Sequence, residues 1–268
     1  MSDSIRTDEE RGVLRVTIDR QARMNAIDLA AMAELAGVIG AAADRPETRV
    51  IVLTGAGKAF CTGADLAAAA AAGGNEASPE LVMDTANAAV RAIIDSPLPV
   101  IARVNGPAAG VGASLALAAD LVYAAEDAYL LLPFTSIGLM PDGGATAIVA
   151  AAMGRARAAE MALLGGRLPA AEAAAAGLIT RSVPAAELDE LVGTVAAKLA
   201  AGPRRALELT KAALNAATLP GLDSALATEK TGQVELLTSA DFLEGMTAML
   251  TRRVPQFAGA PSPIADPA

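Results

Sequence analysis

Residues 99–128 read PVIARVNGPAAGVGASLALAADLVYAAEDA, a sequence in which a strand, a small-residue loop and a helix follow one another. Residues 100–104 form an apolar run bounded by a proline and an Asn-Gly pair, which predicts a buried strand. Residues 112–119 predict a short apolar helix. Small residues between the two let the backbone approach a ligand, and the helix start leaves N–H groups without partners.

Strand-plus-helix units continue on both sides of this stretch. The patterns predict strands over 13–18, 49–53, 100–104, 121–124 and 128–132, and helices over 28–43, 80–95 and 112–119. After Gly144 helices dominate, over about 145–152, 155–164, 169–176, 185–201, 204–217, 221–237 and 240–251. Residues 67–79, an alanine run followed by Gly, Asn, Ser and Pro, predict a mobile surface loop. The whole is typical of an α/β core with a helical C-terminal layer.

Composition excludes several classes of protein. The 268 residues contain no His and one Cys, which excludes imidazole catalysis, imidazole metal sites and a disulfide within the chain. Acidic residues outnumber basic ones by 30 to 21, a net charge of −9, so nucleic-acid binding is not expected. The polar N-terminus and the absence of a long apolar run predict no signal peptide, no membrane contact and a cytoplasmic location.

A second small-residue loop, KAFCTGADL at 58–66, also follows a strand. Two free N–H groups from such loops, converging on one point, would form an oxyanion hole. The alternative is that the small residues only allow tight packing of strand and helix. A dinucleotide loop is disfavoured because the third glycine of its fingerprint would fall at Leu115. Ser114 lies in a sequence like a nucleophile elbow, but no histidine exists to activate it.

With these motifs in place the chain resembles the crotonase (enoyl-CoA hydratase/isomerase) family over about residues 10–257. The matching segments are Met24-Asn25-Ala26, 58–66, 99–128, GLMPDGGA at 138–145, 154–179 and EGMTAMLTRRVPQF at 244–257. The resemblance implies a crotonase-like ββα spiral core over 1–200, a C-terminal helical oligomerisation region over 201–257, and a disordered tail over 258–268. It also implies a homotrimer or a dimer of trimers.

The resemblance further implies an acyl-CoA thioester substrate, with coenzyme A as part of the substrate and no metal or other cofactor. The two oxyanion donors would be the backbone N–H groups of Ala64 and Val111, where most relatives have glycine at the second position. Residues implied to contact substrate are Ala22, Arg23, Ala64, Asp65, Leu66, Val111, Ser114 and Phe134. Asp65 has an alternative role as a hydrogen-bond acceptor that stabilises the loop. Packing is the expected role of Cys61 and Thr62.

Family hydratases use two glutamates, and the matching positions here are Ser114 and Phe134. Neither side chain can act as a carboxylate. Asp142 instead falls where related isomerases carry an acid, a combination that most resembles the 1,2-epoxyphenylacetyl-CoA isomerase branch. The resemblance thus implies an enoyl-CoA isomerase in which Asp142 carries the proton between two carbons. An N-cap of the helix that begins near Gly144 is the alternative role of Asp142.

Two other hypotheses for the function stay open. One is an enoyl-CoA hydratase with a non-standard acid/base set, and the other is a non-catalytic acyl-CoA-binding subunit. Arg252 and Arg253 are candidates for contacts to the coenzyme, with a solvated helix end as the alternative. Phe242, Met246 and Leu250 recur at helical spacing and predict a docking face.

Overall fold

The computed structural model describes residues 4–71 and 77–258 and contains two sheets. The larger sheet has the order β1-β2-β3-β4-β6-β9. Its strands are β1 (Ile5–Glu10), β2 (Val13–Ile18), β3 (Val50–Gly55), β4 (Val100–Val104), β6 (Leu121–Ala125) and β9 (Arg181–Val183). The smaller sheet has the order β5-β7-β8 and comprises β5 (Ala108–Ala109), β7 (Tyr129–Leu131) and β8 (Leu168–Pro169). All neighbours from β2 to β9 pair in parallel, which requires the helical crossovers that the sequence predicts.

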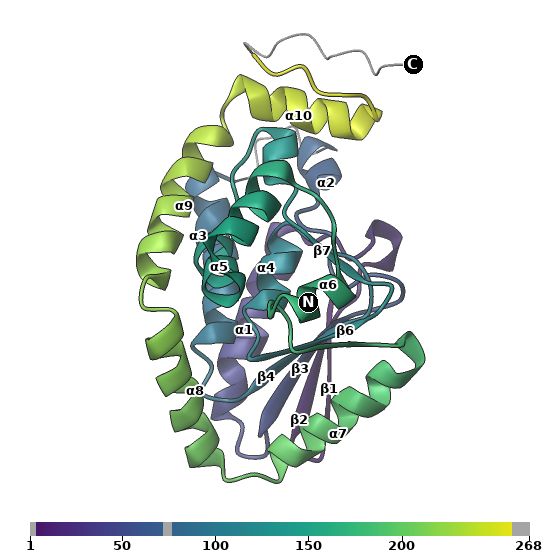
Figure 1. Cartoon of the computed structure of the whole chain (residues 1–268), viewed down its shortest axis with the longest axis vertical. Helices are drawn as coiled ribbons and strands as arrows, with labels where there is room; N and C mark the ends of the chain where they lie inside the picture. The colour runs from purple at the N-terminus through teal and green to yellow at the C-terminus, as the bar shows by residue number, and fades with distance from the viewer. Residues whose placement is uncertain (1–3, 72–76, 259–268) are drawn as a thin grey trace.

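Helices cover the sheets and extend beyond them (Figure 1). They are α1 (Leu29–Gly40), α2 (Leu66–Ala71), α3 (Pro79–Ile94), α4 (Val111–Leu117), α5 (Ala145–Leu164), α6 (Ala170–Ala175), α7 (Leu188–Ala200), α8 (Arg204–Thr218), α9 (Leu222–Leu236) and α10 (Ala240–Thr251). Short 3-10 turns are η1 (Gln21–Arg23), η2 (Ala41–Asp44), η3 (Phe134–Ile137) and η4 (Ala185–Glu187). Helices α8 and α9 run along one edge of the molecule in Figure 1, and α10 lies across the top. The α/β core with a helical C-terminal layer is confirmed.

The central strands are apolar because both faces of the sheet are covered. All six residues of β3 are buried, and Ile51 and Leu53 are fully enclosed. Helix α1 begins after Asp28, whose carboxylate accepts the Ala31 N–H at 2.9 Å, and α3 begins after Ser78 with proline at its first position. These side-chain caps explain why the helix starts are readable in the sequence.

Three expectations need correction. Residues 66–71 form helix α2 rather than a loop, because Asp65 caps its first turn; residues 72–76 of the expected loop lie outside the described residues. Strand β1 was not expected because only Ile5 of its residues is buried; its pairing to β2 is made by the backbone alone. Ala258, the first residue of the expected tail, donates its N–H to Asp241 at 2.9 Å, and 259–268 lie outside the described residues.

The predicted docking face on α10 is also partly wrong. Phe242 packs against the core, and a Cβ added to Gly245 would lie 2.5 Å from the Ile137 backbone, so this face of α10 is pressed onto η3. Leu250 is exposed as predicted and Met246 is half-buried, while Leu243 and Met249, outside the predicted face, are exposed as well. Within the described part of the chain, no helix combines the length and apolarity needed to cross a bilayer.

Candidate active site

The two small-residue loops lie side by side at the ends of β3 and β4. Cys61 and Ala108 form a parallel bridge, and the Ala109 N–H donates to the Cys61 carbonyl at 2.9 Å. Further along the loops, a Cβ on Gly63 would lie 3.8 Å from the Gly110 Cα, so the residues that precede Ala64 and Val111 are neighbours. The two loops that were expected to converge therefore do meet.

Glycine allows the close approach of these loops. Gly63 has φ +98°, and a Cβ there would lie 3.0 Å from the Ala109 carbonyl oxygen. Gly110 has φ +55° and faces the Cα of Gly63. Such φ values suit glycine because a side chain would be strained. Gly112 differs: its φ is ordinary, but a Cβ would lie 2.2 Å from the Cys61 carbonyl, so here the small residue serves helix packing.

The N–H groups of Ala64 and Val111 have no protein acceptor among residues 4–71 and 77–258. The Ile27 N–H donates to the Gly63 carbonyl, and the Ile27 carbonyl accepts the Asp65 N–H. The N–H of Ala64, which lies between these two groups along the chain, therefore points to the opposite side. Val111 is the first residue of α4, where an N–H has no partner within the helix. Ala64 is exposed while Val111 is buried. The pair can polarise an oxygen placed between the loops.

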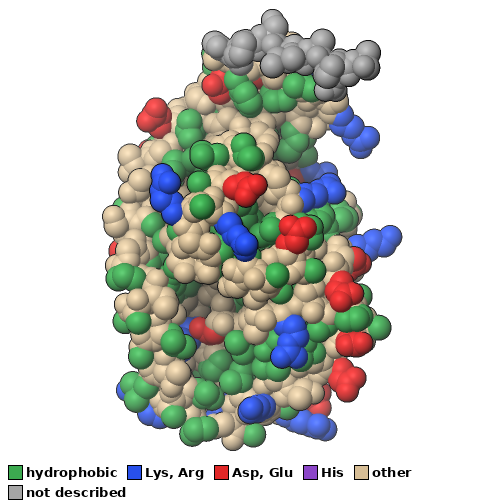
Figure 2. All heavy atoms as spheres, in the orientation of Figure 1, with side chains coloured by type: hydrophobic (Ala, Val, Ile, Leu, Met, Phe, Trp, Pro, Cys, Tyr) green, Lys and Arg blue, Asp and Glu red, His purple; other side chains and the backbone are tan. Residues whose placement is uncertain are grey.

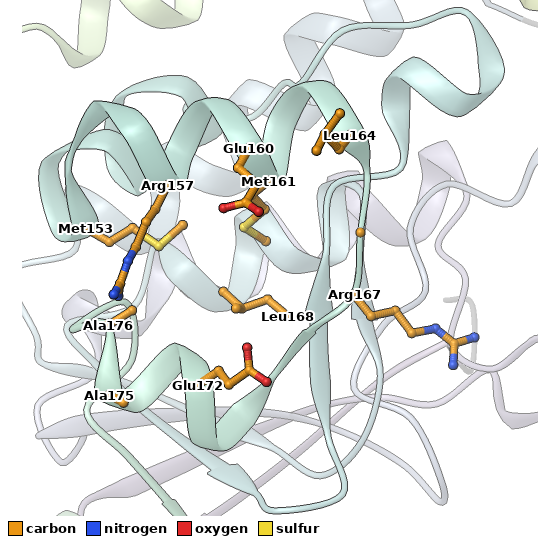
Figure 3. A pocket seen from close by; sticks show the side chains of 11 residues that line it. Met153, Arg157, Glu160, Met161, Leu164, Arg167, Leu168, Glu172, Ala175 and Ala176 are labelled. Atoms are coloured by element: carbon orange, nitrogen blue, oxygen red, sulfur yellow. The ribbon is translucent and has the colours of Figure 1, made fainter.

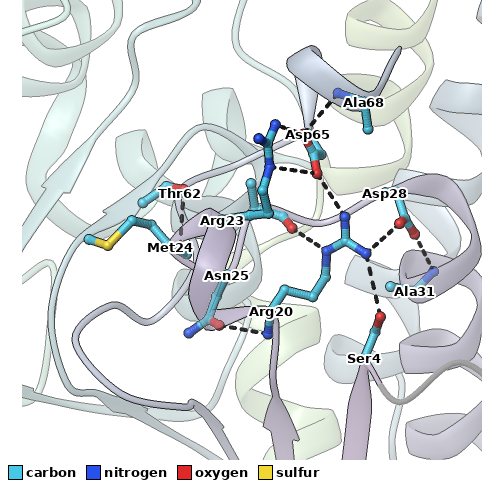
Figure 4. Close-up of polar contacts among 11 residues, drawn as sticks. Ser4, Arg20, Arg23, Met24, Asn25, Asp28, Ala31, Thr62, Asp65 and Ala68 are labelled. Atoms are coloured by element: carbon cyan, nitrogen blue, oxygen red, sulfur yellow. Dashed lines mark hydrogen bonds and ion pairs between the residues drawn. The ribbon is translucent and has the colours of Figure 1, made fainter. Parts of the chain in front are cut away.

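Asp65 anchors the first loop (Figure 4). Its oxygens accept from Arg20 Nη2 and Arg23 Nη2, each at 2.7 Å, and from the Ala68 N–H at 3.0 Å. Burial alone would raise the pKa of Asp65, but the bonds from Arg23, Ala68 and Arg20 outweigh it and lower the pKa. The carboxylate is thus permanently charged near neutral pH, which fits the loop-stabilising role and does not suit a proton acceptor.

Asn25 is a residue whose role the sequence did not reveal. It is fully buried with φ +58°, and its Nδ2 donates to the carbonyls of Ala56 at 2.8 Å and Ala59 at 2.7 Å. Its side chain therefore holds the turn that leads into the 58–66 loop. A cavity of about 210 Å³ opens beside this turn, lined by Gln21, Met24, Ala56, Lys58 and Ala59. Contact of the coenzyme with the neighbouring Ala22, Arg23 and Leu66 stays a prediction.

Asp142 lies near the first turn of α4. Ser114, one turn after Val111, donates its hydroxyl to the Asp142 carbonyl at 2.8 Å. A Cβ on Gly143 would lie 2.8 Å from the Ser114 Cβ, so the 142–144 segment packs directly on this turn. Phe134 closes the neighbouring side: its ring tip is 3.9 Å from where a Gly110 Cβ would be. The fold thus gathers Phe134 and Asp142 around the first turn of α4, which carries Val111 and Ser114.

Asp142 is buried, with 8% of the residue exposed. Its Oδ2 accepts from Gln233 Nε2 at 2.8 Å, while its Oδ1 is buried and has no partner in the described structure. Burial raises the pKa of Asp142 to about 7; the Gln233 hydrogen bond lowers it and the Glu229 charge raises it. A carboxyl with this pKa can both take and return a proton near neutral pH.

The alternative role of Asp142 as a helix cap is not observed. Helix α5 begins after Gly144, and the carboxylate of Glu229, from α9, accepts the N–H groups of Gly144 at 2.7 Å and Thr146 at 2.9 Å. Neither Glu229 nor Gln233 was predicted from the sequence as a site residue. The signal was present in α9, where Leu222, Leu226, Glu229 and Gln233 recur at the spacing of one buried helix face, with two polar residues among the apolar ones.

The remaining candidates lie elsewhere or act otherwise. Arg253 pairs with Glu244 at 2.5 Å, and Arg252 ends α10 with φ +56°. Burial raises the pKa of the Cys61 thiol to about 12, so it serves packing. In the described part of the chain no group of three His, Cys, Asp or Glu residues could hold a metal ion.

A larger cavity, of about 430 Å³, lies between α5 and α6 (Figure 3). Arg157, Glu160, Met161, Leu168 and Glu172 are among the residues that line it. None of the predicted site residues does so. We therefore place the candidate active site at the two loops and Asp142 and not in this cavity.

Comparisons with known proteins agree with the geometry. Residues 8–260 match the family model described as enoyl-CoA hydratase/isomerase. A probable enoyl-CoA hydratase of Rhodobacter capsulatus is 44% identical over 96% of this chain and 98% of its own. The 1,2-epoxyphenylacetyl-CoA isomerase of Escherichia coli is 38% identical over 97% of this chain and 100% of its own. The crystal structure of an enoyl-CoA hydratase from Mycobacterium avium subsp. paratuberculosis is similar with a TM-score of 0.88, at 47% identity, covering 95% of this chain and 98% of that one.

Proposed function

Because the chain belongs to the enoyl-CoA hydratase/isomerase family, whose members act on acyl-CoA thioesters, we propose that it is an enoyl-CoA isomerase with Asp142 as the proton carrier. The observation that carries the proposal is the buried Asp142 carboxyl, with one free oxygen and a pKa raised to about 7, packed against the helix turn that begins with Val111. The relatives carry both hydratase and isomerase names, so the choice between them rests on the site.

The proposed reaction shifts a double bond along the acyl chain. The thioester carbonyl accepts hydrogen bonds from the N–H groups of Ala64 and Val111. The ionised Asp142 removes a proton from C2 of a 3-enoyl thioester. The electron pair of that C–H bond forms a C1–C2 double bond, and the π pair of the carbonyl moves to its oxygen. The resulting dienolate takes the same proton back at C4, which leaves a 2-enoyl thioester and restores the carboxylate.

Hydration would require a second acid/base group to activate water. The two positions at which family hydratases carry glutamate hold Ser114 and Phe134 here. The Ser114 hydroxyl already donates to the Asp142 carbonyl, and Phe134 has no proton to exchange. One carboxyl is sufficient for a double-bond shift, so the residues present favour isomerisation.

Purified protein incubated with a 3-enoyl-CoA tests the proposal by the absorbance of the conjugated 2-enoyl thioester that forms. Asp142→Asn is expected to lower kcat by about 10²–10⁴-fold, the usual contribution of a general base. Asp127→Asn, at an exposed aspartate, is the matched control and should retain the wild-type rate.

Three outcomes contradict the proposal. Normal turnover by Asp142→Asn removes the residue from the mechanism. Hydration of crotonyl-CoA that is lost in Asp142→Ala, without any isomerisation, assigns the protein as a hydratase. Tight binding of acyl-CoA esters with no turnover over a panel of substrates assigns it as a binding subunit.

A further inference from the structure

Gln233 places a neutral amide inside the protein next to Asp142. Its side chain is 1% exposed, and it shares the buried face of α9 with Leu222, Leu226 and Glu229. A buried amide costs free energy unless its donors and acceptors are paired. Its partners therefore show what the amide does.

The orientation of this amide is determined by a backbone group. The Met140 N–H donates to Gln233 Oε1 at 3.2 Å, and an N–H can only donate, so the oxygen of the amide must be on that side. The Nε2 group then faces Asp142 Oδ2 at 2.8 Å. Met140 and Asp142 belong to the same short loop segment, so the Gln233 side chain binds this segment at two points.

We propose that Gln233 is a positioning residue for Asp142: it holds Oδ2 and thereby leaves Oδ1 as the oxygen that exchanges the proton. This inference rests on the proposed function. Without the hydrogen bond, the carboxyl group could rotate about its Cβ–Cγ bond and present either oxygen. A fixed rotamer keeps one oxygen in place for both proton transfers.

Glu229 supplies the opposing influence. It is fully buried on α9, one turn before Gln233, and its charge raises the pKa of Asp142 while the Gln233 bond lowers it. The other elements packed on the 142–144 segment present uncharged groups, Ser114 from α4 and Val90 from α3. Glu229, whose own pKa is raised by burial, is thus the titratable side chain acting on Asp142 within the described structure, and when ionised it opposes the effect of Gln233.

This opposition gives a test that a loss of packing cannot imitate. In Gln233→Glu, Oε1 still accepts the Met140 N–H, but two carboxyl groups now share one hydrogen bond. We expect the acidic limb of the kcat/KM profile to move to higher pH by about one unit or more. Glu229→Gln removes the nearby charge and should move the limb to lower pH. Glu235→Gln, at an exposed position of the same helix, should leave it in place.

A measurement without turnover separates this inference from the proposed function. Infrared difference spectra, wild type minus Asp142→Asn, follow the titration of the Asp142 carboxyl, and the same subtraction is made in each variant background. The inference is supported if the titration midpoint of Asp142 and the acidic limb of the kcat/KM profile move together. Both should move to higher pH in Gln233→Glu and to lower pH in Glu229→Gln. If the titration moves and the profile does not, Asp142 is not the base and the proposed function fails.

If the titration of Asp142 stays in place in a folded Gln233→Glu protein, the positioning role is overturned while the Asp142→Asn result still judges the function. Should Gln233→Glu not fold, Gln233→Met replaces it. Methionine keeps the volume and donates no hydrogen bond, so the titration must still move to higher pH.

Discussion

Asp142 and Asp65 are the same residue type in opposite electrostatic environments. Asp65 is almost fully enclosed but accepts bonds from two guanidinium groups, which lower its pKa despite burial. Asp142 is buried with one amide donor, and burial raises its pKa to about 7. At the scale of the residue, the number of cationic donors separates an anchoring carboxylate from a carboxyl that can exchange protons.

The raised pKa of Asp142 has a consequence for stability. In the unfolded chain this carboxyl ionises near pH 4, whereas the folded protein keeps the proton up to about pH 7. Folded protein therefore binds more protons than unfolded protein between these values, and stability falls as pH rises through this window. Above pH 7 the full cost of the buried charge is present.

Asp142→Asn removes that cost, so it should be the more stable protein at pH 8 by roughly 2–4 kcal/mol. The advantage should shrink as pH falls from 7 and vanish near pH 4. Urea denaturation of both proteins at four or five pH values measures it. An advantage that is the same at every pH would show that the carboxyl is not buried as an acid.

At the scale of the element, helix α8 is docked by polar side chains. Lys211 Nζ donates to the carbonyls of Ile93 at 2.9 Å and Leu98 at 3.2 Å, and it pairs with Asp120 at 2.9 Å. Asn215 donates to the Ile94 carbonyl at 3.0 Å. The bonds to Ile93 and Ile94 satisfy carbonyls at the C-terminal end of α3, which the helix itself cannot pair, and the bond to Leu98 holds the segment that follows. Lys211 is only 7% exposed, although a sequence pattern would place a lysine on the surface.

Lys211→Met keeps the aliphatic stem but leaves Asp120 and the carbonyls without their cation. We expect a loss of about 3 kcal/mol in the free energy of unfolding, as for other broken buried pairs. Lys198→Met, at an exposed site on α7, should cost little. Adding Asp120→Asn to the first variant should recover part of the loss. A Lys211→Met protein as stable as wild type would contradict the docking role.

At the scale of the whole molecule, hydrophobic side chains lie between the charged ones over the face shown in Figure 2. Large exposed residues include Leu163 and Leu164 on α5, Leu209 and Leu214 on α8, and Leu243 and Leu250 on α10. The two α5 leucines are 69% and 74% exposed. Exposed leucine pairs on α5, α8 and α10 are typical of surfaces that become covered when chains associate.

We predict a homotrimer or a dimer of trimers, with the C-terminal helices in the contacts. Sedimentation velocity should show a species of three or six chains. The double variant Leu243→Glu/Leu250→Glu should sediment more slowly, and Glu235→Gln should sediment as wild type does. Wild-type protein that sediments only as a monomer at micromolar concentration would contradict the prediction.

Most helices and strands could be predicted from the sequence because their signals lie within a few neighbouring residues. Strand β2 and helices α1 and α3 were predicted within a residue or two, apart from the 3-10 turn that extends α1, because apolar period, caps and proline positions act over a few residues. Strand β1 was not predicted because an edge strand needs no apolar residues. Helix α2 was not predicted because its cap is the same Asp65 that stabilises the loop. Motif positions also predicted Asp142 and the loops.

The sequence by itself determined the alternation of strands and helices, the two glycine-containing loops and the lone acid at 142. Tertiary structure alone decided what that acid can do. The acid is buried with a free Oδ1, and it feels the hydrogen bond of Gln233 and the charge of Glu229, both about 90 residues away in the sequence. A pKa depends on solvation and on charges within a few ångströms, and no local pattern records which distant helix supplies them.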